Sequence, residues 1–137
     1  MRNEYKAIAP DELKVGMRVA YPTRINAGWR GDFRYPTWLD AIVQRVTPKR
    51  TKVVLAIIKD GKTTEAIEVN PQKDPVCEPD EAMKHENECV SNYIGCGDIL
   101  LKYNAHKWKE LENLTDEELR KAYMHLVALD EIMRKEP

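Results

Sequence analysis

The sequence predicts an α+β protein in which a meander of β-strands precedes a set of helices. Three observations carry this prediction. Residues 39–69 hold three short runs rich in Val, Ile and Leu, separated by turn-forming residues. Residues 13–21 alternate between apolar and polar positions, as a strand with one buried face does. After residue 115, apolar residues recur at spacings of three and four, which is typical of an amphipathic helix.

The runs of the meander are joined by recognisable turns. Residues 41–46 and 52–58 flank Thr-Pro-Lys-Arg, in which Pro48 presets the backbone φ for the second position of a type I turn. The next break is Asp60-Gly61, a dipeptide that tolerates the positive φ values of a type I′ hairpin turn. Residues 65–69 then alternate again, so a third strand is expected after this turn.

Two further strands and a helix are expected around the meander. The first strand covers residues 13–21 and ends at Pro22, and the last covers residues 97–103. Between the meander and that last strand, Pro79-Asp80-Glu81 has the composition of a first helical turn, with acids near the positive end of the helix dipole. Gly95 is expected to end this helix.

The tail of the chain is expected to be helical. A short helix is predicted over residues 105–111, with Trp108 packing inward, and Thr115 and Glu118 have the spacing of a capping box at the start of the final helix. The apolar stripe of that helix is expected to pack on the sheet. An alternative is that it forms a dimer or partner seam, to which Met124, His125 and Met133 are suited. The stripe consists of Leu119, Ala122, Tyr123, Leu126, Leu129 and Met133.

The order of these elements resembles that of the SH3-like small barrels, in particular the KOW and Tudor-type modules. The resemblance rests on Leu-Lys-Val-Gly-Met-Arg-Val at residues 13–19, followed by a long loop, the meander and a late strand. It implies a small antiparallel β-barrel over residues 1–103, with a helical insertion at about 70–96 before the last strand. Residues 104–137 would then form helices packed on the barrel. It also implies that the first long loop, residues 22–36, is the binding face.

Length and composition fit a soluble protein of the cytoplasm. The 137 residues suffice for one domain with a substantial core. Three cysteines are an odd number, so reduced thiols are expected rather than a secreted disulfide framework. No apolar run approaches the ~20 residues that cross a bilayer, and the N-terminal residues lack the apolar core of a signal peptide.

Charge is unevenly distributed along the chain. Residues 1–62 contain thirteen Lys or Arg and six Asp or Glu, whereas residues 63–137 contain nine and seventeen. This asymmetry suggests a basic side that faces a polyanion and an acidic side that faces solvent or a protein. The alternative is that both are solvated faces that attract each other within the fold.

The loop at residues 22–36 is the main candidate for a binding site, because arginines and aromatic residues are interleaved in it. Aromatic rings stack on unpaired bases, and Arg neutralises phosphate or stacks itself. The first functional hypothesis is therefore a non-enzymatic nucleic-acid-binding module. Its candidate ligand-binding residues are Arg24, Trp29, Arg30, Phe33, Arg34, Tyr35, Lys49, Arg50 and Lys52.

The aromatic residues of this loop have two other interpretations. Trp29, Phe33 and Tyr35 could fold back to cap an open end of the barrel. Together with Trp38 they could instead form an aromatic cage for a methylated cation, although the neighbouring arginines would repel such a ligand.

Metal binding and catalysis have weaker support. Cys77, His85, Cys89 and Cys96 could supply four zinc ligands, but their spacing lacks the C-x2-C pair of structural zinc sites, so no metal is expected. His85, His106 and His125 stand at no telling distance from a serine or an acid, and no catalytic residue or cofactor is assigned.

The second functional hypothesis is a small accessory or inhibitor protein. Such proteins, including many encoded by phages and mobile elements, are short, charged and non-catalytic. In that case the acidic C-terminal half would engage a protein partner. Charge reversal of each half would discriminate between the two hypotheses. The sequence leaves the partner and the oligomeric state open.

Overall fold

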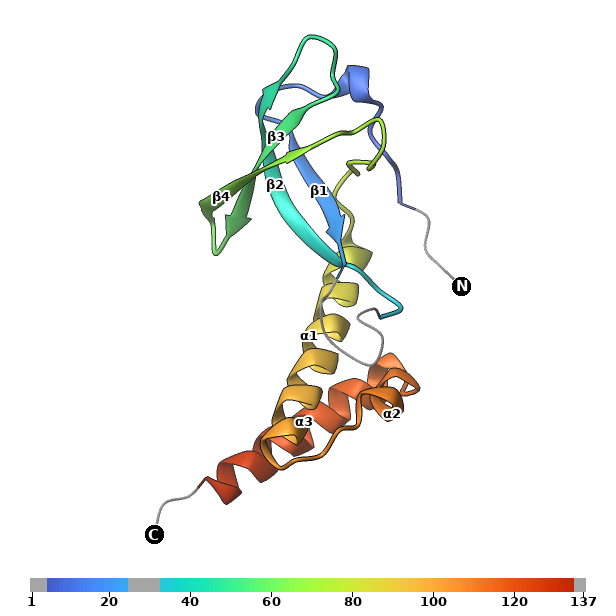
Figure 1. Cartoon of the computed structure of the whole chain (residues 1–137), viewed down its shortest axis with the longest axis vertical. Coiled ribbons are helices and arrows are strands. Elements are labelled where there is room, and N and C mark those ends of the chain that lie inside the picture. Colours follow the sequence, from blue (N-terminus) through green and yellow to red (C-terminus); the bar gives the residue numbers. More distant parts are fainter. Residues whose placement is uncertain (1–4, 25–32, 135–137) are drawn as a thin grey trace. The chain divides into compact units, whose positions relative to one another are not determined.

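The computed structural model describes residues 5–24 and 33–134, and it confirms the α+β class (Figure 1). The chain divides into two compact units. The first comprises Met1–Thr23 and Trp38–Met83, and the second comprises Arg24–Thr37 and Lys84–Pro137. The domain boundary expected between residues 103 and 104 falls inside the second unit.

The first unit is built on a four-stranded sheet. Its strands are β1 (Arg18–Thr23), β2 (Thr37–Val46), β3 (Val53–Lys59) and β4 (Lys62–Val69), in the order β1-β2-β3-β4. β2 pairs antiparallel with β3, and β3 pairs antiparallel with β4, which confirms the predicted meander. The sheet does not close into a barrel, so the closed SH3-like barrel remains a resemblance in the order of elements.

Both predicted turns of the meander are present. The amide of Arg50 donates to the carbonyl of Thr47 at 2.9 Å, which closes the turn that contains Pro48. Asp60 and Gly61 have φ values of 53° and 75°, as a type I′ hairpin requires. The first strand, in contrast, begins later in the sequence than predicted. Gly16 (φ 94°) lies in a turn that leaves Val15 67% exposed, so β1 begins only at Arg18. β1 also continues through Pro22 instead of ending there.

One face of the sheet carries the core of the first unit. Val19, Val43 and Leu55 are fully buried there, and Leu13 and Val76 join them from outside the sheet. The remaining buried members of this core are Ile8, Ala41, Val53, Ile57 and Val69. Burial of apolar side chains is worth ~1.5–3 kcal/mol per large residue, so this cluster is the main source of the unit's stability.

The helix after the sheet is longer than expected. α1 runs without interruption from Glu81 to Lys102, so the expected stop at Gly95 and the expected strand at residues 97–103 were wrong. The two glycines allow close packing instead of ending the helix. A Cβ on Gly97 would lie 2.0 Å from the ring of Trp108, and one on Gly95 would lie 2.4 Å from the ring of Tyr123. Because no strand follows α1 among the described residues, this helix is not an insertion before a last strand.

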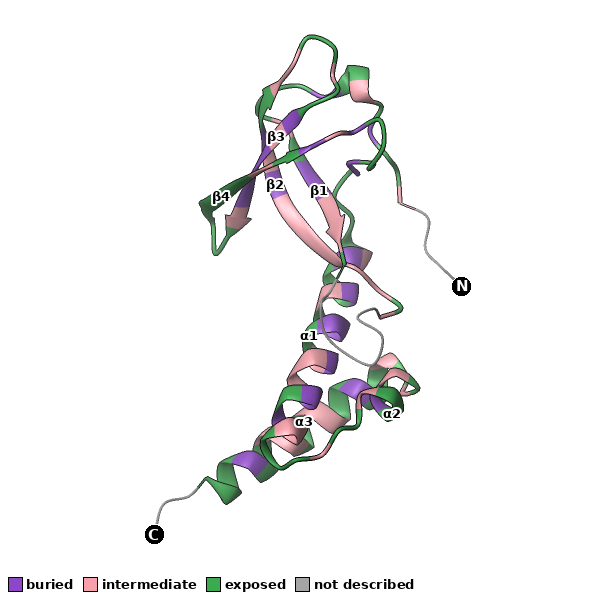
Figure 2. Ribbon diagram, in the orientation of Figure 1, coloured by how far each residue is buried: buried purple, intermediate pink, exposed green. Residues whose placement is uncertain are grey.

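The second unit packs α1 against two further helices, α2 (Trp108–Glu112) and α3 (Asp116–Met133). The capping box of α3 is confirmed, because Thr115 accepts from the amide of Glu118 while the Glu118 carboxylate accepts from the amide of Thr115. Trp108 packs inward as predicted. Figure 2 shows buried residues along one side of α1. The core of this unit consists of Cys89, Val90, Tyr93, Cys96, Leu111 and Leu119.

α1 and α3 run in the same direction, because the residues in contact advance together along both helices. Residues 103–115, which include α2, return the chain to the start of the pair. The inner stripe of α3, with Leu119, Tyr123 and Leu126, packs on α1 within this unit. The contacts along the pair join Cys89 to Asp116, Cys96 to Leu119 and Lys102 to Asp130.

Candidate functional site

The predicted binding loop is described only in part. Trp29 and Arg30 lie outside the described residues, and Arg24 is exposed. Phe33 and Tyr35 are half-buried against the helices of the second unit. The ring of Phe33 stacks on that of Tyr93, with centroids 4.3 Å apart and planes at 11°. In the described part of the loop, these two rings therefore act as packing groups.

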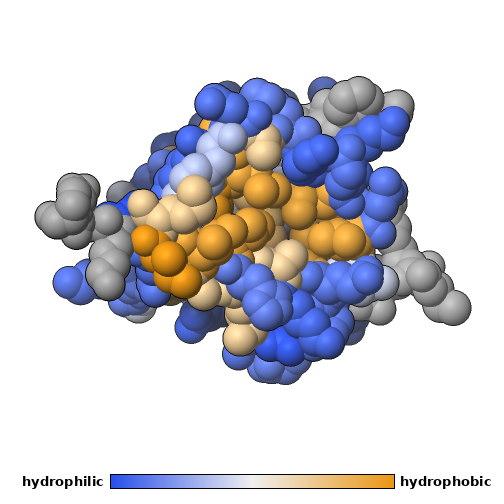
Figure 3. All heavy atoms as spheres, turned by 90° about the horizontal axis from the view of Figure 1, so that it is seen from below, coloured by the Kyte–Doolittle hydropathy of each residue, from blue (hydrophilic) through white to orange (hydrophobic). Residues whose placement is uncertain are grey.

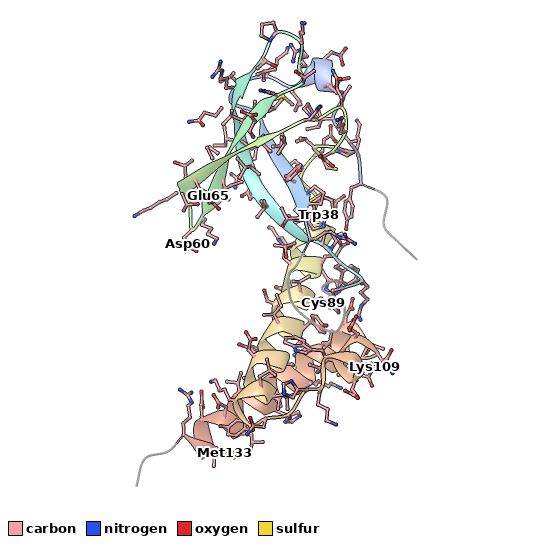
Figure 4. All side chains as sticks on the ribbon, viewed as in Figure 1. Trp38, Asp60, Glu65, Cys89, Lys109 and Met133 are labelled. Carbon is pink, nitrogen blue, oxygen red and sulfur yellow. The ribbon has the colours of Figure 1, made fainter. Side chains whose placement is uncertain are left out.

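Arg34, Tyr35, His85 and Cys89 converge on the carboxylate of Asp116, the first residue of α3. Arg34 donates from Nε at 3.1 Å and from Nη2 at 2.7 Å, both to Oδ1. Tyr35 donates its hydroxyl to Oδ2 at 2.8 Å, and the Nε2 of His85 lies 2.9 Å from the same oxygen. The thiol of Cys89, on α1 (Figure 4), donates to Oδ1 at 3.2 Å. We call these five residues the Asp116 cluster.

The donors of the Asp116 cluster keep this carboxylate ionised. Burial alone would raise the pKa of Asp116, but the hydrogen bonds from Arg34, His85, Tyr35 and Cys89 outweigh it and hold the pKa well below its usual range. The pKa of Arg34 is raised: burial lowers it, while the bond to Asp116 more than compensates. Burial and the same carboxylate raise the pKa of Tyr35. The cluster therefore contains a stable ion pair.

Although it contains Cys, His and Asp, the cluster does not have the arrangement of a nucleophilic triad. Such a triad needs the thiol beside the imidazole, with the acid behind it. Here the carboxylate of Asp116 lies between Cys89 and His85 and contacts both. Burial and the hydrogen bond to Asp116 raise the pKa of the Cys89 thiol to about 12, so it is protonated at neutral pH. The geometry instead supports a structural role, in which the cluster holds residues 33–35 against the helices of the second unit.

The four residues weighed as zinc ligands lie in two different units. Cys77 belongs to the first unit, where its backbone pairs with that of Ala20 at 2.9 Å. His85, Cys89 and Cys96 belong to the second, and the thiol of Cys96 lies 3.9 Å from the carbonyl of Leu119. Among residues 5–24 and 33–134, no group of three or more His, Cys, Asp or Glu side chains is arranged to hold a metal ion.

The described residues weighed as an aromatic cage are divided between the two units. Trp38 is in the first unit and makes an edge-on contact with Tyr5, with ring centroids 4.8 Å apart. Phe33 and Tyr35 are in the second unit and contact each other edge-on at 6.0 Å. The described rings are thus used in two different packing contacts.

The basic residues near the first hairpin turn differ in their roles. Arg50 donates to the carbonyl oxygens of Leu13 at 2.6 Å and Pro10 at 3.1 Å, so its guanidinium anchors the N-terminal segment to the turn. Lys52 is exposed and lies 3.9 Å from a carboxylate oxygen of Glu68. Lys49 is exposed.

The charge asymmetry along the chain disappears when charges are counted by unit. The first unit contains eleven Lys or Arg and eleven Asp or Glu, and the second contains eleven and twelve. Their net charges are therefore 0 and −1, which sum to the −1 of the whole chain. Neither unit has the strongly basic balance that is typical of nucleic-acid-binding domains.

The outward side of α3 carries the largest exposed apolar residues of the helices. Ile132 is 69% exposed, Met124 57%, Met133 55% and Leu129 50%. Together with the exposed Ala128 they form what we call the α3 face. In Figure 3, apolar atoms gather on the face of the molecule that is seen from below. The sequence favours Met124 and Met133 as members of a partner seam, whereas Leu129 and Met133, which it assigns to the packed stripe, are exposed.

Comparison of the chain with protein-family models, with curated proteins and with solved structures found no match. No helix in the described part of the chain is long and apolar enough to cross a membrane.

Proposed function

We propose that the protein is a non-enzymatic binding protein that engages another protein through the α3 face. The proposal rests on the last ten residues of α3, from Met124 to Met133. They place apolar side chains on nearly every side of the helix. A helix of this kind is normally buried on every side. Here the inner side packs on α1, whereas the outer side is exposed.

The polar residues of this segment leave the α3 face largely apolar. Asp130 is buried and forms ion pairs with Lys102 and Arg134, both at 3.1 Å. His125 and Glu131 are the other two polar residues of the segment. Contiguous exposed apolar surface on a small protein commonly marks an interaction site. Methionine suits such a site because its flexible side chain adapts to different partners.

The charge balance of the two units favours a protein partner over a nucleic acid. Five of the seven described candidates in the nucleic-acid hypothesis already make internal side-chain contacts, namely Phe33, Arg34, Tyr35, Arg50 and Lys52. Side chains that make internal contacts are less available to a nucleic acid. The accessory or inhibitor hypothesis, which does not need them, is therefore favoured. The proposal differs from that hypothesis in the chemistry of the surface, because the α3 face is apolar rather than acidic.

Site-specific photo-cross-linking in cells that make the protein tests this proposal. A photoreactive amino acid is placed at Ala128 on the α3 face or, as a control, at the exposed Thr64 on β4. We expect a discrete protein adduct from Ala128 only, which Ile132→Glu abolishes and the control Thr63→Glu preserves. Equal adducts from both positions, or none from Ala128, would contradict the proposal. A nuclease-sensitive adduct from Lys49 would instead support the nucleic-acid hypothesis.

A further inference from the structure

We infer that the partner of the α3 face is a second copy of this chain, packed antiparallel along α3. This inference rests on the proposed function, because it names the protein that the α3 face binds. It follows from the order of charged and apolar residues along the outer side of the helix, beginning with Lys121.

Four exposed residues on the outer side of α3 have the spacing of a helix–helix seam. Lys121 and Ala128 are seven residues apart, and so are Met124 and Glu131, with the alternating spacings of three and four found in helix–helix seams. All four residues are exposed. They therefore form one line along the outer side, with the apolar pair in the middle and one charge of each sign at the two ends.

Antiparallel pairing of two such lines is complementary. In an antiparallel helix pair the two seam positions face each other, so Met124 of one copy would pack against Ala128 of the other. The same register places Lys121 of one copy opposite Glu131 of the other, at both ends of the seam. A large side chain then meets a small one, and each cation meets an anion.

Parallel pairing lacks this complementarity. It would place Lys121 opposite the second copy's Lys121 and Glu131 opposite the second copy's Glu131. Like charges that face each other across a seam are destabilising, and they specify against that arrangement. Electrostatic pairing of this kind sets the orientation of helix pairs more than it sets their affinity.

The expected dimer is weak. Stable specific interfaces bury about 1,200–2,000 Å² of surface, and a seam of about three helical turns lies at or below the lower end of that range. Ile132 and Leu129, beside the seam, add apolar contact area. We therefore expect dissociation in the micromolar range, with the monomer dominant in dilute solution.

Sedimentation equilibrium of the full chain, from about 1 to 500 µM, tests the inference through charge exchange. Lys121→Glu or Glu131→Lys alone should raise the dimer dissociation constant about tenfold, because each places like charges opposite each other twice. The double variant should restore it to within about threefold of the original, because both pairs are re-formed with reversed signs. Lys59→Glu and Glu65→Lys, on the exposed β3–β4 hairpin, make the same changes in net charge away from the seam and should have no effect.

Each outcome decides the matter. A chain that stays monomeric at about 500 µM overturns the inference. Dimerisation that the double variant fails to restore overturns the antiparallel seam. In either case, an Ala128 adduct with a different protein leaves the proposed function standing. An adduct at twice the mass of the chain supports both, and the absence of any adduct counts against the proposed function itself. All four substituted positions are exposed, so we expect every variant to fold. Unfolding curves of the variants check this.

Discussion

Arg34 and Asp116 form a two-bond ion pair across 82 residues of chain, with the Nε and Nη2 of the guanidinium 3.1 and 2.7 Å from one carboxylate oxygen. Arg34 also donates from Nη1 to the carbonyl of Glu112 at 3.1 Å, so it closes the end of α2 as well. Asp116 lies in the first turn of α3, where the helix dipole favours a negative charge. This pair fixes residues 33–35 on the helices.

Asp116→Asn should lower the free energy of unfolding by about 2–3 kcal/mol. The amide keeps the size of the side chain but loses the charge-assisted hydrogen bonds and leaves the Arg34 charge without its partner. Urea denaturation at neutral pH measures the change. Asp40→Asn is the matched control, because Asp40 pairs with Arg18 at a more exposed site, where such pairs are worth about 0–1 kcal/mol. Equal losses in the two variants would contradict a special role for the Asp116 cluster.

The contribution of Asp116 should depend on pH in a defined direction. Its pKa is lower in the folded protein than the ~3.9 of the unfolded chain, so its stabilisation is present above about pH 5 and is lost as the pH falls through the unfolded value toward the folded one. The difference in unfolding free energy between wild type and Asp116→Asn should therefore stay constant from about pH 7 to pH 5 and shrink below that. Urea titrations at several pH values measure it. A difference that grows on acidification would contradict the assignment.

Gly97→Ala should destabilise the protein, although alanine is the better helix former by ~0.5–1 kcal/mol. The added methyl group would meet the ring of Trp108 at 2.0 Å, and overpacking of this kind costs about 1–3 kcal/mol. Thermal or urea unfolding measures the effect, with Ser91→Ala on the exposed side of α1 as a control. In a Trp108→Leu background the cost of Gly97→Ala should fall, and an unchanged cost would show that the ring is not responsible.

The native thiols should react slowly with alkylating and disulfide reagents. Cys77, Cys89 and Cys96 are buried, and burial raises the pKa of the Cys96 thiol to about 11. Because the thiolate is the reactive form, we expect rates at least about a hundredfold below those of the urea-unfolded chain near pH 8. Ser91→Cys, at an exposed site, should react at the rate of a free thiol. A native cysteine that reacts at the rate of a free thiol would contradict this prediction and would be a candidate nucleophile.

The parts of the fold that follow from local chemistry could be predicted from the sequence. The Asp60-Gly61 turn and the Thr115–Glu118 capping box depend on residues a few positions apart, and both are present. α1 could not be delimited in this way. Gly95 and Gly97 have the composition of a helix end, but tertiary packing against Tyr123 and Trp108 decides their role.

The candidate site shows the same limit. The sequence indicated that Phe33, Arg34 and Tyr35 are unusual in a loop, but not which partners they contact. Their partners, Tyr93 and Asp116, are distant in sequence, and one carboxylate that accepts from four side chains has no local signature. The charge asymmetry appears only when charges are counted in the two halves of the sequence. Each structural unit contains residues from both halves, so the asymmetry is lost in the fold.

The discontinuity of the second unit has a consequence for synthesis on the ribosome. Arg34 is made 82 residues before Asp116, which at about 5–20 residues per second is an interval of about 4–16 s. Phe33 is made before the ring of Tyr93, and Tyr35 before the carboxylate of Asp116, which they contact in the native fold. The contacts that fix residues 33–35 on the helices can therefore form only after the start of α3 has left the ribosome.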